Sequence, residues 1–215
     1  VSTYLTSPDL VNDAANENIS HVTTFAAILG FVLSLLIIGV IFKSLIAPLI
    51  STLSMLMMYV VSLGLINNLA DRTSFPYSEY LPLLTLLLTL VLGTLGHYYL
   101  FNAFKQNVAD GQDAAAATTH SVHAVRNFLL ILGGTLTVLF ASFYAFGFST
   151  IRALSALAIV TIVITIGLYT IAPIFMQLSG ERFFWPAVES TSRPHRFWNW
   201  MARFGLWQPF IAIIA

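Results

Sequence analysis

Residues 81–103 read LPLLTLLLTL VLGTLGHYYL FNA, and this stretch decides the fold. It contains no Asp, Glu, Lys or Arg. A helix of about 20 apolar residues spans the ~30 Å hydrocarbon layer of a bilayer at 1.5 Å per residue. An open strand would leave its backbone groups without hydrogen bonds in lipid, so the segment has to be helical. The stretch therefore predicts a transmembrane helix.

Three side chains interrupt the hydrocarbon character of this segment: His97, Tyr98 and Tyr99. Polar and titratable groups inside a membrane helix are costly, and they are functional candidates for that reason. Consecutive residues diverge by about 100° around a helix, so the two phenols lie on different faces. One of them can line a path while the other packs. We treat all three as candidates for proton relay or transport.

The rest of the chain repeats the membrane pattern. Of the 215 residues, 58% are hydrophobic and 8% are charged, whereas an ordinary soluble domain has roughly 25% charged residues. Four more apolar runs are long enough to cross a membrane, at residues 25–42, 46–66, 128–148 and 154–178, and a further run begins at Phe210. The predicted fold class is an all-α integral membrane protein with five transmembrane helices and the start of a sixth.

Composition also excludes several classes of function. The formal net charge is zero, which gives no basis for nucleic-acid binding. The chain has no cysteine, so disulfides, thiol catalysis and cysteine metal sites are ruled out. An intramembrane hydrolase would need a nucleophile near His97, and neither Ser nor Asp lies four residues before or after it. We expect no enzyme activity and no cofactor.

Charge placement divides the chain and orients it. Residues 1–20 are polar and mildly acidic; they form the end of an extracytoplasmic segment or a tail without a role of its own. Residues 21–180 form the five-helix domain, and 181–215 form an aromatic and basic interfacial linker with the start of the next helix. Of the nine Lys and Arg residues, seven lie on the side of the first, third and C-terminal connections, and the other two, Arg72 and Arg152, lie in the second and fourth. Positive charge favours the cytoplasm, so the predicted N-terminal end is outside a plasma or inner membrane.

Two further histidines lie in the connection before the fourth run. His120 and His123 are three residues apart, and we expect them on one face of a short interfacial helix that Asp113 caps. Zinc needs at least three protein ligands, and no third one is evident nearby. Solvated surface histidines are the better interpretation, so no metal site is predicted.

Depth indicates what surrounds His97. It lies six residues before Ala103, roughly 9 Å from the inner end of its helix. The level that matches it on the fourth run is near Gly134. Small residues permit close helix approach, so the predicted packing positions around the histidine are Gly93, Gly96, Gly133, Gly134, Thr135 and Thr137.

The order of several motifs resembles the membrane half of MMPL-type transporters of the resistance–nodulation–division (RND) superfamily. These motifs are FKSLIAPL at 42–49, the Gly-x-x-Gly step at 93–96, GFSTIRAL at 147–154 and RFFWP at 182–186. The resemblance covers residues 20–215 and implies a portion of a first membrane half. It implies proton-driven export of a lipidic or amphipathic substrate. It further implies a second membrane half and an extracytoplasmic porter domain outside this chain.

The resemblance also gives His97 a context. The family usually carries Asp-Tyr at this point as its proton-coupling site, and here the pair is His97-Tyr98. Aspartate is an anion when it loses its proton, whereas histidine is a cation when it gains one, so the charge cycle is inverted. Two interpretations stay open. Either His97 carries the proton itself, or this half is an uncoupled accessory or structural module in which His97 is a neutral hydrogen-bonding residue.

Overall fold

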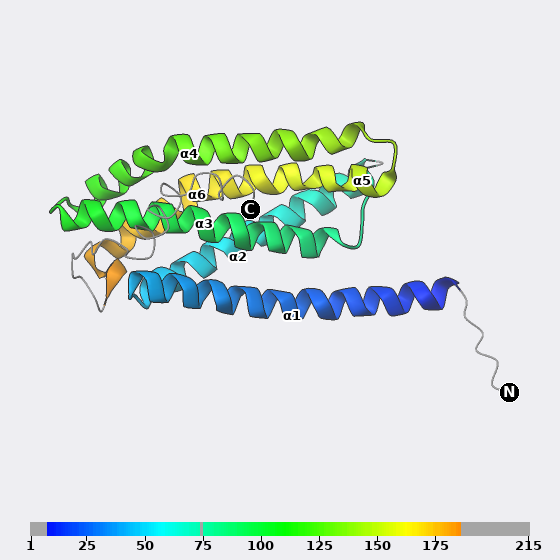
Figure 1. The fold of residues 1–215 in the computed structure, drawn as a ribbon, viewed down its shortest axis with the longest axis horizontal. Helices are drawn as coiled ribbons and strands as arrows, with labels where there is room; N and C mark the ends of the chain where they lie inside the picture. Colours follow the sequence, from blue (N-terminus) through cyan, green and yellow to red (C-terminus); the bar gives the residue numbers. More distant parts are fainter. Residues whose placement is uncertain (1–7, 74, 186–215) are drawn as a thin grey trace, which may run out of the picture.

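The computed structural model describes residues 8–73 and 75–185, and the predicted interfacial helix around Trp198 and the run from Phe210 lie outside this part. Five long helices form the fold (Figure 1), and their bounds are Pro8–Phe42 (α1), Ile46–Arg72 (α2), Leu81–Ala109 (α3), Ala114–Ser142 (α4) and Leu157–Ser179 (α6). Four short helical segments join or end them, at Phe143–Ala145 (η1), Ser149–Ala153 (α5), Leu154–Ala156 (η2) and Gly180–Phe184 (η3). The described part contains no β-strand.

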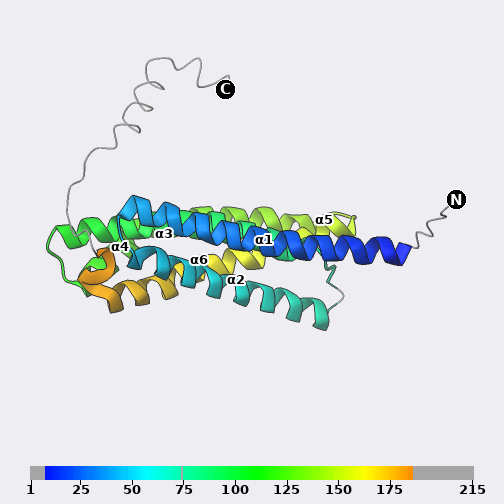
Figure 2. The ribbon, with the colours of Figure 1, turned by 90° about the horizontal axis from the view of Figure 1, so that it is seen from below.

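The helices lie side by side along one long axis, and each long helix runs back along the one before it (Figures 1 and 2). Helices α3 and α6 occupy the centre and pack against each other, while both contact α2 and α4. Helix α1 packs on α2 and α3 and, like α4, exposes most of its side chains. Within residues 8–73 and 75–185, five helices are long and apolar enough to cross a membrane. This confirms the predicted all-α fold with five spans, while the predicted start of a sixth lies outside the described residues.

The helix ends differ from the sequence prediction. Helix α3 extends six residues past Ala103, to Ala109, and α4 begins at Ala114 as one continuous helix. The prediction of a separate interfacial helix carrying His120 and His123 is therefore wrong. The extension is held by Asn107, whose Nδ2 donates to Ser121 Oγ at 2.9 Å, so polar residues join the two helix ends where apolar periodicity stops.

Other boundaries shift in the same way. Helix α1 already begins at Pro8, within the tail predicted to end at residue 20. Helix α4 ends at Ser142 and not at Phe148, and the turn predicted before the fifth run is the short helix α5. The Asp113 carboxylate does accept from the Ala116 N–H at 3.3 Å, which confirms it as the cap of α4.

A tight turn connects α1 to α2 and ties both to the far end of the chain. Lys43 adopts a left-handed backbone conformation with φ of 51°. The buried hydroxyl of Ser44 donates to the Phe183 carbonyl at 2.7 Å and accepts from the Ile46 and Ala47 N–H groups at 3.1 Å each. The Leu45 N–H also donates to the Trp185 carbonyl at 3.1 Å. One serine thus satisfies free N–H groups at the start of α2 and positions η3.

We predict that Ser44→Ala lowers the free energy of unfolding by about 1–3 kcal/mol, since it removes a helix-start acceptor and a buried hydrogen bond. The matched control is Ser142→Ala, because that exposed hydroxyl bonds only to Leu139 of its own helix. Denaturation of both variants in mixed detergent micelles measures the difference. Equal stability of the two variants would contradict a tying role for Ser44.

Candidate functional site

His97 lies in the centre of the bundle, with none of its surface exposed. Its Nδ1 lies 2.7 Å from the Gly93 carbonyl oxygen, one turn earlier on α3. A carbonyl only accepts, so Nδ1 carries the hydrogen and donates it. The other ring nitrogen, Nε2, has no hydrogen-bond partner within residues 8–73 and 75–185. In the neutral ring Nε2 is therefore a buried, unoccupied acceptor, which is the atom that would take up a proton.

The two tyrosines reach different neighbours, although their rings meet edge to face with centroids 5.3 Å apart. Tyr98 is half-buried and its ring lies 6.1 Å from that of Phe42 on α1. Tyr99 is 41% exposed and packs against Phe128 of α4, with ring centroids 4.5 Å apart. The expected divergence of the two phenols is only partial, because each packs on a different helix while their rings still touch. Tyr98 faces the interior side of α1, while Tyr99 covers the joint between α3 and α4.

Two glycines let α3 approach its neighbours around His97. A Cβ at Gly93 would lie 2.7 Å from Met55 Cγ on α2. A Cβ at Gly96 would lie 2.2 Å from Leu168 Cδ1 on α6. Both distances are shorter than a carbon contact allows, so any side chain there would force the helices or their side chains apart. Gly93 and Gly96 therefore have the packing role that the sequence predicted.

The residues expected opposite His97 on α4 are divided between two surfaces. Gly133 faces α6, where a Cβ would lie 2.2 Å from Thr165 Oγ1, and Thr137 Oγ1 donates to Thr161 Oγ1 of α6 at 3.2 Å. Gly134 and Thr135 are exposed, and a Cβ at Gly134 would meet no atom within 4 Å. Gly133 and Thr137 therefore lie at a helix contact, as predicted, but the contact is with α6 and not with α3.

Helix α2 brings a second set of polar groups that the sequence analysis did not single out. The hydroxyls of Ser51, Ser54 and Ser62 are buried and have no hydrogen-bond partner in the described part of the chain. Helices α2 and α3 are antiparallel, and Met55 contacts Gly93. One turn back from Met55 is Ser51, and one turn on from Gly93 is His97, so these two residues share a level. In the sequence, these serines could have been recognised as a polar stripe because their spacing puts them on one face of an apolar helix.

Aromatic rings close the other side of the histidine. The His97 ring meets Phe101 edge to face at 5.2 Å, and Phe101 meets Phe183 at 4.7 Å. The cluster is completed by the buried rings of Phe42, Phe104 and Phe184. Hydroxyls therefore lie on the α2 side of His97, and a dry aromatic cluster lies between it and the end of the bundle where η3 folds back.

The histidines of α4 have a different setting. His120 is exposed, and its Nδ1 lies 2.9 Å from Gln112 Oε1, while His123 is also exposed. Within the described residues, no group of three or more His, Cys, Asp or Glu side chains is placed to hold a metal ion.

Comparison with known families identifies the chain. The model of the MMPL family matches residues 1–212. The chain belongs to the MMPL family. Among curated proteins, it is 24% identical over 221 residues to the Bacillus subtilis (strain 168) protein named "Putative membrane protein YdgH". That alignment covers all of this chain and 24% of the relative, so the chain spans about a quarter of its length. No solved structure matches.

Membership of the MMPL family confirms the resemblance drawn from the motifs around residues 42–49, 93–96, 147–154 and 182–186. Together with the five apolar helices, it establishes a multi-pass membrane protein. His97 lies on α3, one residue after the Gly-x-x-Gly step at 93–96. The geometry adds that this position is fully buried and that its free nitrogen is unpaired in the described part of the chain.

We predict that Gly96→Ala destabilises the protein by about 1–3 kcal/mol, the usual cost of overpacking a close contact. Gly134→Ala is the matched control. It adds the same methyl group into open space, and alanine is favoured over glycine in helices, so its stability should be unchanged or slightly higher. Thermal unfolding of both variants in the same detergent measures the effect. A Gly96→Ala protein as stable as the parent would refute close packing at this point.

Proposed function

We propose that this chain is part of a membrane transporter that exports a lipidic or amphipathic substrate and is driven by proton movement, with His97 as the proton carrier. The observation that carries the proposal is the difference between the two ring nitrogens. Nδ1 donates to the Gly93 carbonyl at 2.7 Å, whereas Nε2 is buried without a hydrogen-bond partner in the described chain. A fixed donor on one nitrogen aims the other nitrogen, and a free acceptor can gain and lose a proton.

The surroundings of His97 disfavour its protonated state, so a proton carrier at this position needs a counter-charge. On the helices packed against α3, residues 22–42, 46–70, 127–142 and 153–179 contain no Asp, Glu, Lys or Arg. The titratable groups within these ranges are Tyr59 on α2 and Tyr169 on α6, whose hydroxyl donates to the Arg126 carbonyl at 2.7 Å. Helix α4 adds His120, His123 and Arg126 near its start, and all three are exposed. An isolated buried cation is unfavourable. We propose that its counter-charge comes from a second membrane half.

The same proposal covers the substrate path, the membrane and the orientation of the chain. Substrate would pass through an extracytoplasmic porter domain outside this chain, in a plasma or inner membrane. The side of Lys43 and Lys105 would be cytoplasmic, because it carries most of the Lys and Arg residues. The N-terminal end would then be outside.

A second candidate is a non-coupled accessory or structural module, and one observation favours it. His97 is sealed on one side by Phe101 and Phe183, and its Nδ1 bond to Gly93 would satisfy a purely structural neutral ring. The two functions differ in whether the side chain must titrate or only donate a hydrogen bond.

His97→Gln separates these functions. The glutamine amide can donate to the Gly93 carbonyl but cannot carry a proton. We expect it to reduce pH-gradient-dependent transport by the full-length protein to the level of protein-free vesicles, while the folded yield stays near that of the parent. His123→Gln, at an exposed position on α4, should transport normally. Full transport by His97→Gln would eliminate the proton-carrier function and favour the accessory module.

The phenols provide a second test. Tyr98→Phe should slow transport, because Tyr98 adjoins the histidine and its ring lies on the α1 side of the bundle. Tyr99→Phe should leave the transport rate unchanged, because this ring packs on Phe128 and is partly exposed. Initial rates in proteoliposomes at equal protein density compare the two. Equal rates for the two variants would remove Tyr98 from the proposed pathway.

A further inference from the structure

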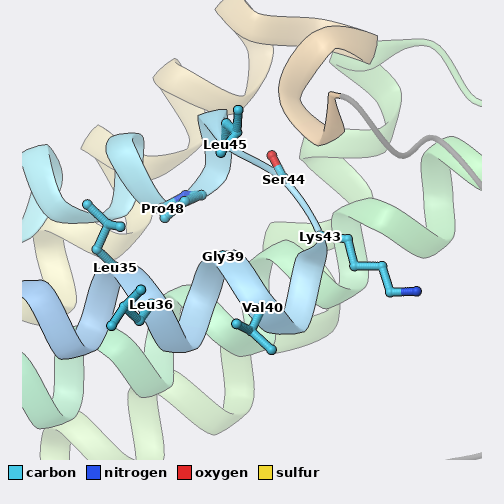
Figure 3. A pocket seen from close by; sticks show the side chains of 8 residues that line it. All are labelled: Leu35, Leu36, Gly39, Val40, Lys43, Ser44, Leu45 and Pro48. Atoms are coloured by element: carbon cyan, nitrogen blue, oxygen red, sulfur yellow. The ribbon is translucent and has the colours of Figure 1, made fainter.

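A groove lies between α1 and α2 at the end of the bundle where the two helices meet. It has a volume of ≈ 390 Å³, within the roughly 300–1,000 Å³ range of ligand pockets. Figure 3 shows its walls: one comes from α1 and the other from the start of α2. It is lined by Leu35, Leu36, Gly39, Val40, Lys43, Ser44, Leu45 and Pro48. The lining is almost entirely hydrocarbon.

Gly39 makes the groove possible. A Cβ there would meet only Pro48 Cγ at 3.6 Å and the Ser44 carbonyl at 3.7 Å, which are ordinary contacts. The position could therefore accept a side chain, and glycine keeps the floor of the groove open. Leu36 and Val40 beside it are exposed. An apolar, concave and exposed surface on a membrane-spanning helix faces either lipid or protein.

The positive charge of Lys43 favours a lipid with an anionic headgroup over a protein segment as the occupant. Lys43 stands at the turn that closes the groove, and its side chain extends beyond the end of α1 (Figure 3). It is the one charged residue in the lining. This turn ends the apolar span, so the ammonium lies at headgroup level while the groove runs back along the span. From Lys43 to Leu35 the helix covers about 12 Å at 1.5 Å per residue, a stretch that an acyl chain can follow.

We infer that this groove binds one anionic phospholipid from the leaflet at the Lys43 end, with an acyl chain along Leu36 and Val40 and the headgroup phosphate beside Lys43. The site is independent of proton coupling and of the transported substrate. The bound lipid would anchor α1. Helices α1 and α4 have the smallest buried share of side chains among the five long helices.

Photolabelling tests the inference. The full-length protein is placed in nanodiscs that contain a trace of phosphatidylglycerol or phosphatidylcholine with a diazirine on one acyl chain, and labelled residues are mapped by mass spectrometry. Phosphatidylglycerol should label Leu36 and Val40 about fivefold more than phosphatidylcholine, the factor equivalent to ~1 kcal/mol for one lysine near a membrane surface. Equal labelling by the two lipids would overturn the inference.

Matched variants assign the preference to the groove. Lys43→Asn removes the charge, and asparagine tolerates the left-handed backbone, so the labelling ratio should fall to about one. Lys43→Arg should keep the preference. Lys105→Asn, which removes a cation near the same end of the bundle, should keep it as well. A ratio unchanged by Lys43→Asn would overturn the headgroup contact.

The acyl-chain contact has its own variants. Gly39→Phe fills the groove and should remove the excess of phosphatidylglycerol labelling at Leu36, while Ile28→Phe, at an exposed position of α1 outside the groove, should keep it. A photoreactive amino acid at Leu36 tests the other occupants. Its crosslinking to another protein segment or to a second copy, in place of lipid, would overturn the inference.

Discussion

The close approach of α3 to α2 and α6 is the constraint on which the rest of the structure depends. Lipid tails are as apolar as leucine, so hydrophobic burial does not drive membrane helices together and close packing has to do so. Glycines supply that packing at three contacts: Gly93 against Met55, Gly96 against Leu168, and Gly167 against Met58. They interlock three helices around one imidazole. Without this approach, His97 would not be shielded from every side.

The environment of His97 is asymmetric. Hydroxyl groups of α2, beginning with Ser51 at the level of the ring, offer dipoles that could solvate a proton. The Phe101 and Phe183 rings offer none, and they lie toward the end of the bundle held by Ser44. A proton reaching Nε2 would therefore have a polar surface on one side and a hydrocarbon barrier on the other.

Sequence reasoning located the spans well because each span is a long apolar run, and length and hydropathy alone determine that property. The ends were harder. Helix α3 continues past Ala103 through polar residues, held by the side-chain bond from Asn107 to Ser121, and hydropathy does not register such a bond. Joining two polar helix ends in this way also explains why α4 begins at Ala114.

The site was also predictable only in part: its central residue could be found from the sequence, but its neighbours on α2 and α4 were not. An imidazole in an apolar run is conspicuous, so His97 could be found, and its burial follows from its surroundings. Depth matching missed both the level and the rotation of α4, because Tyr99 packs on Phe128 and Gly133 faces Thr165 while Gly96 faces Leu168. Gly133 faces α6 while its neighbour Gly134 is exposed. The serines of α2 resemble ordinary small residues until the contact between Met55 and Gly93 fixes the register.

The hydrogen bond between Ser44 and Phe183 has a consequence for biogenesis. It joins residues 139 positions apart in the sequence, and its acceptor follows the fifth span. If the spans enter the membrane in order, the α1–α2 turn has only its local Ser44 bonds until α6 is inserted and η3 folds back. The bond is then a late closing step of assembly. A chain interrupted before α6 would lack the Phe183 acceptor, and Ser44 would keep only its local bonds from the Ile46 and Ala47 N–H groups.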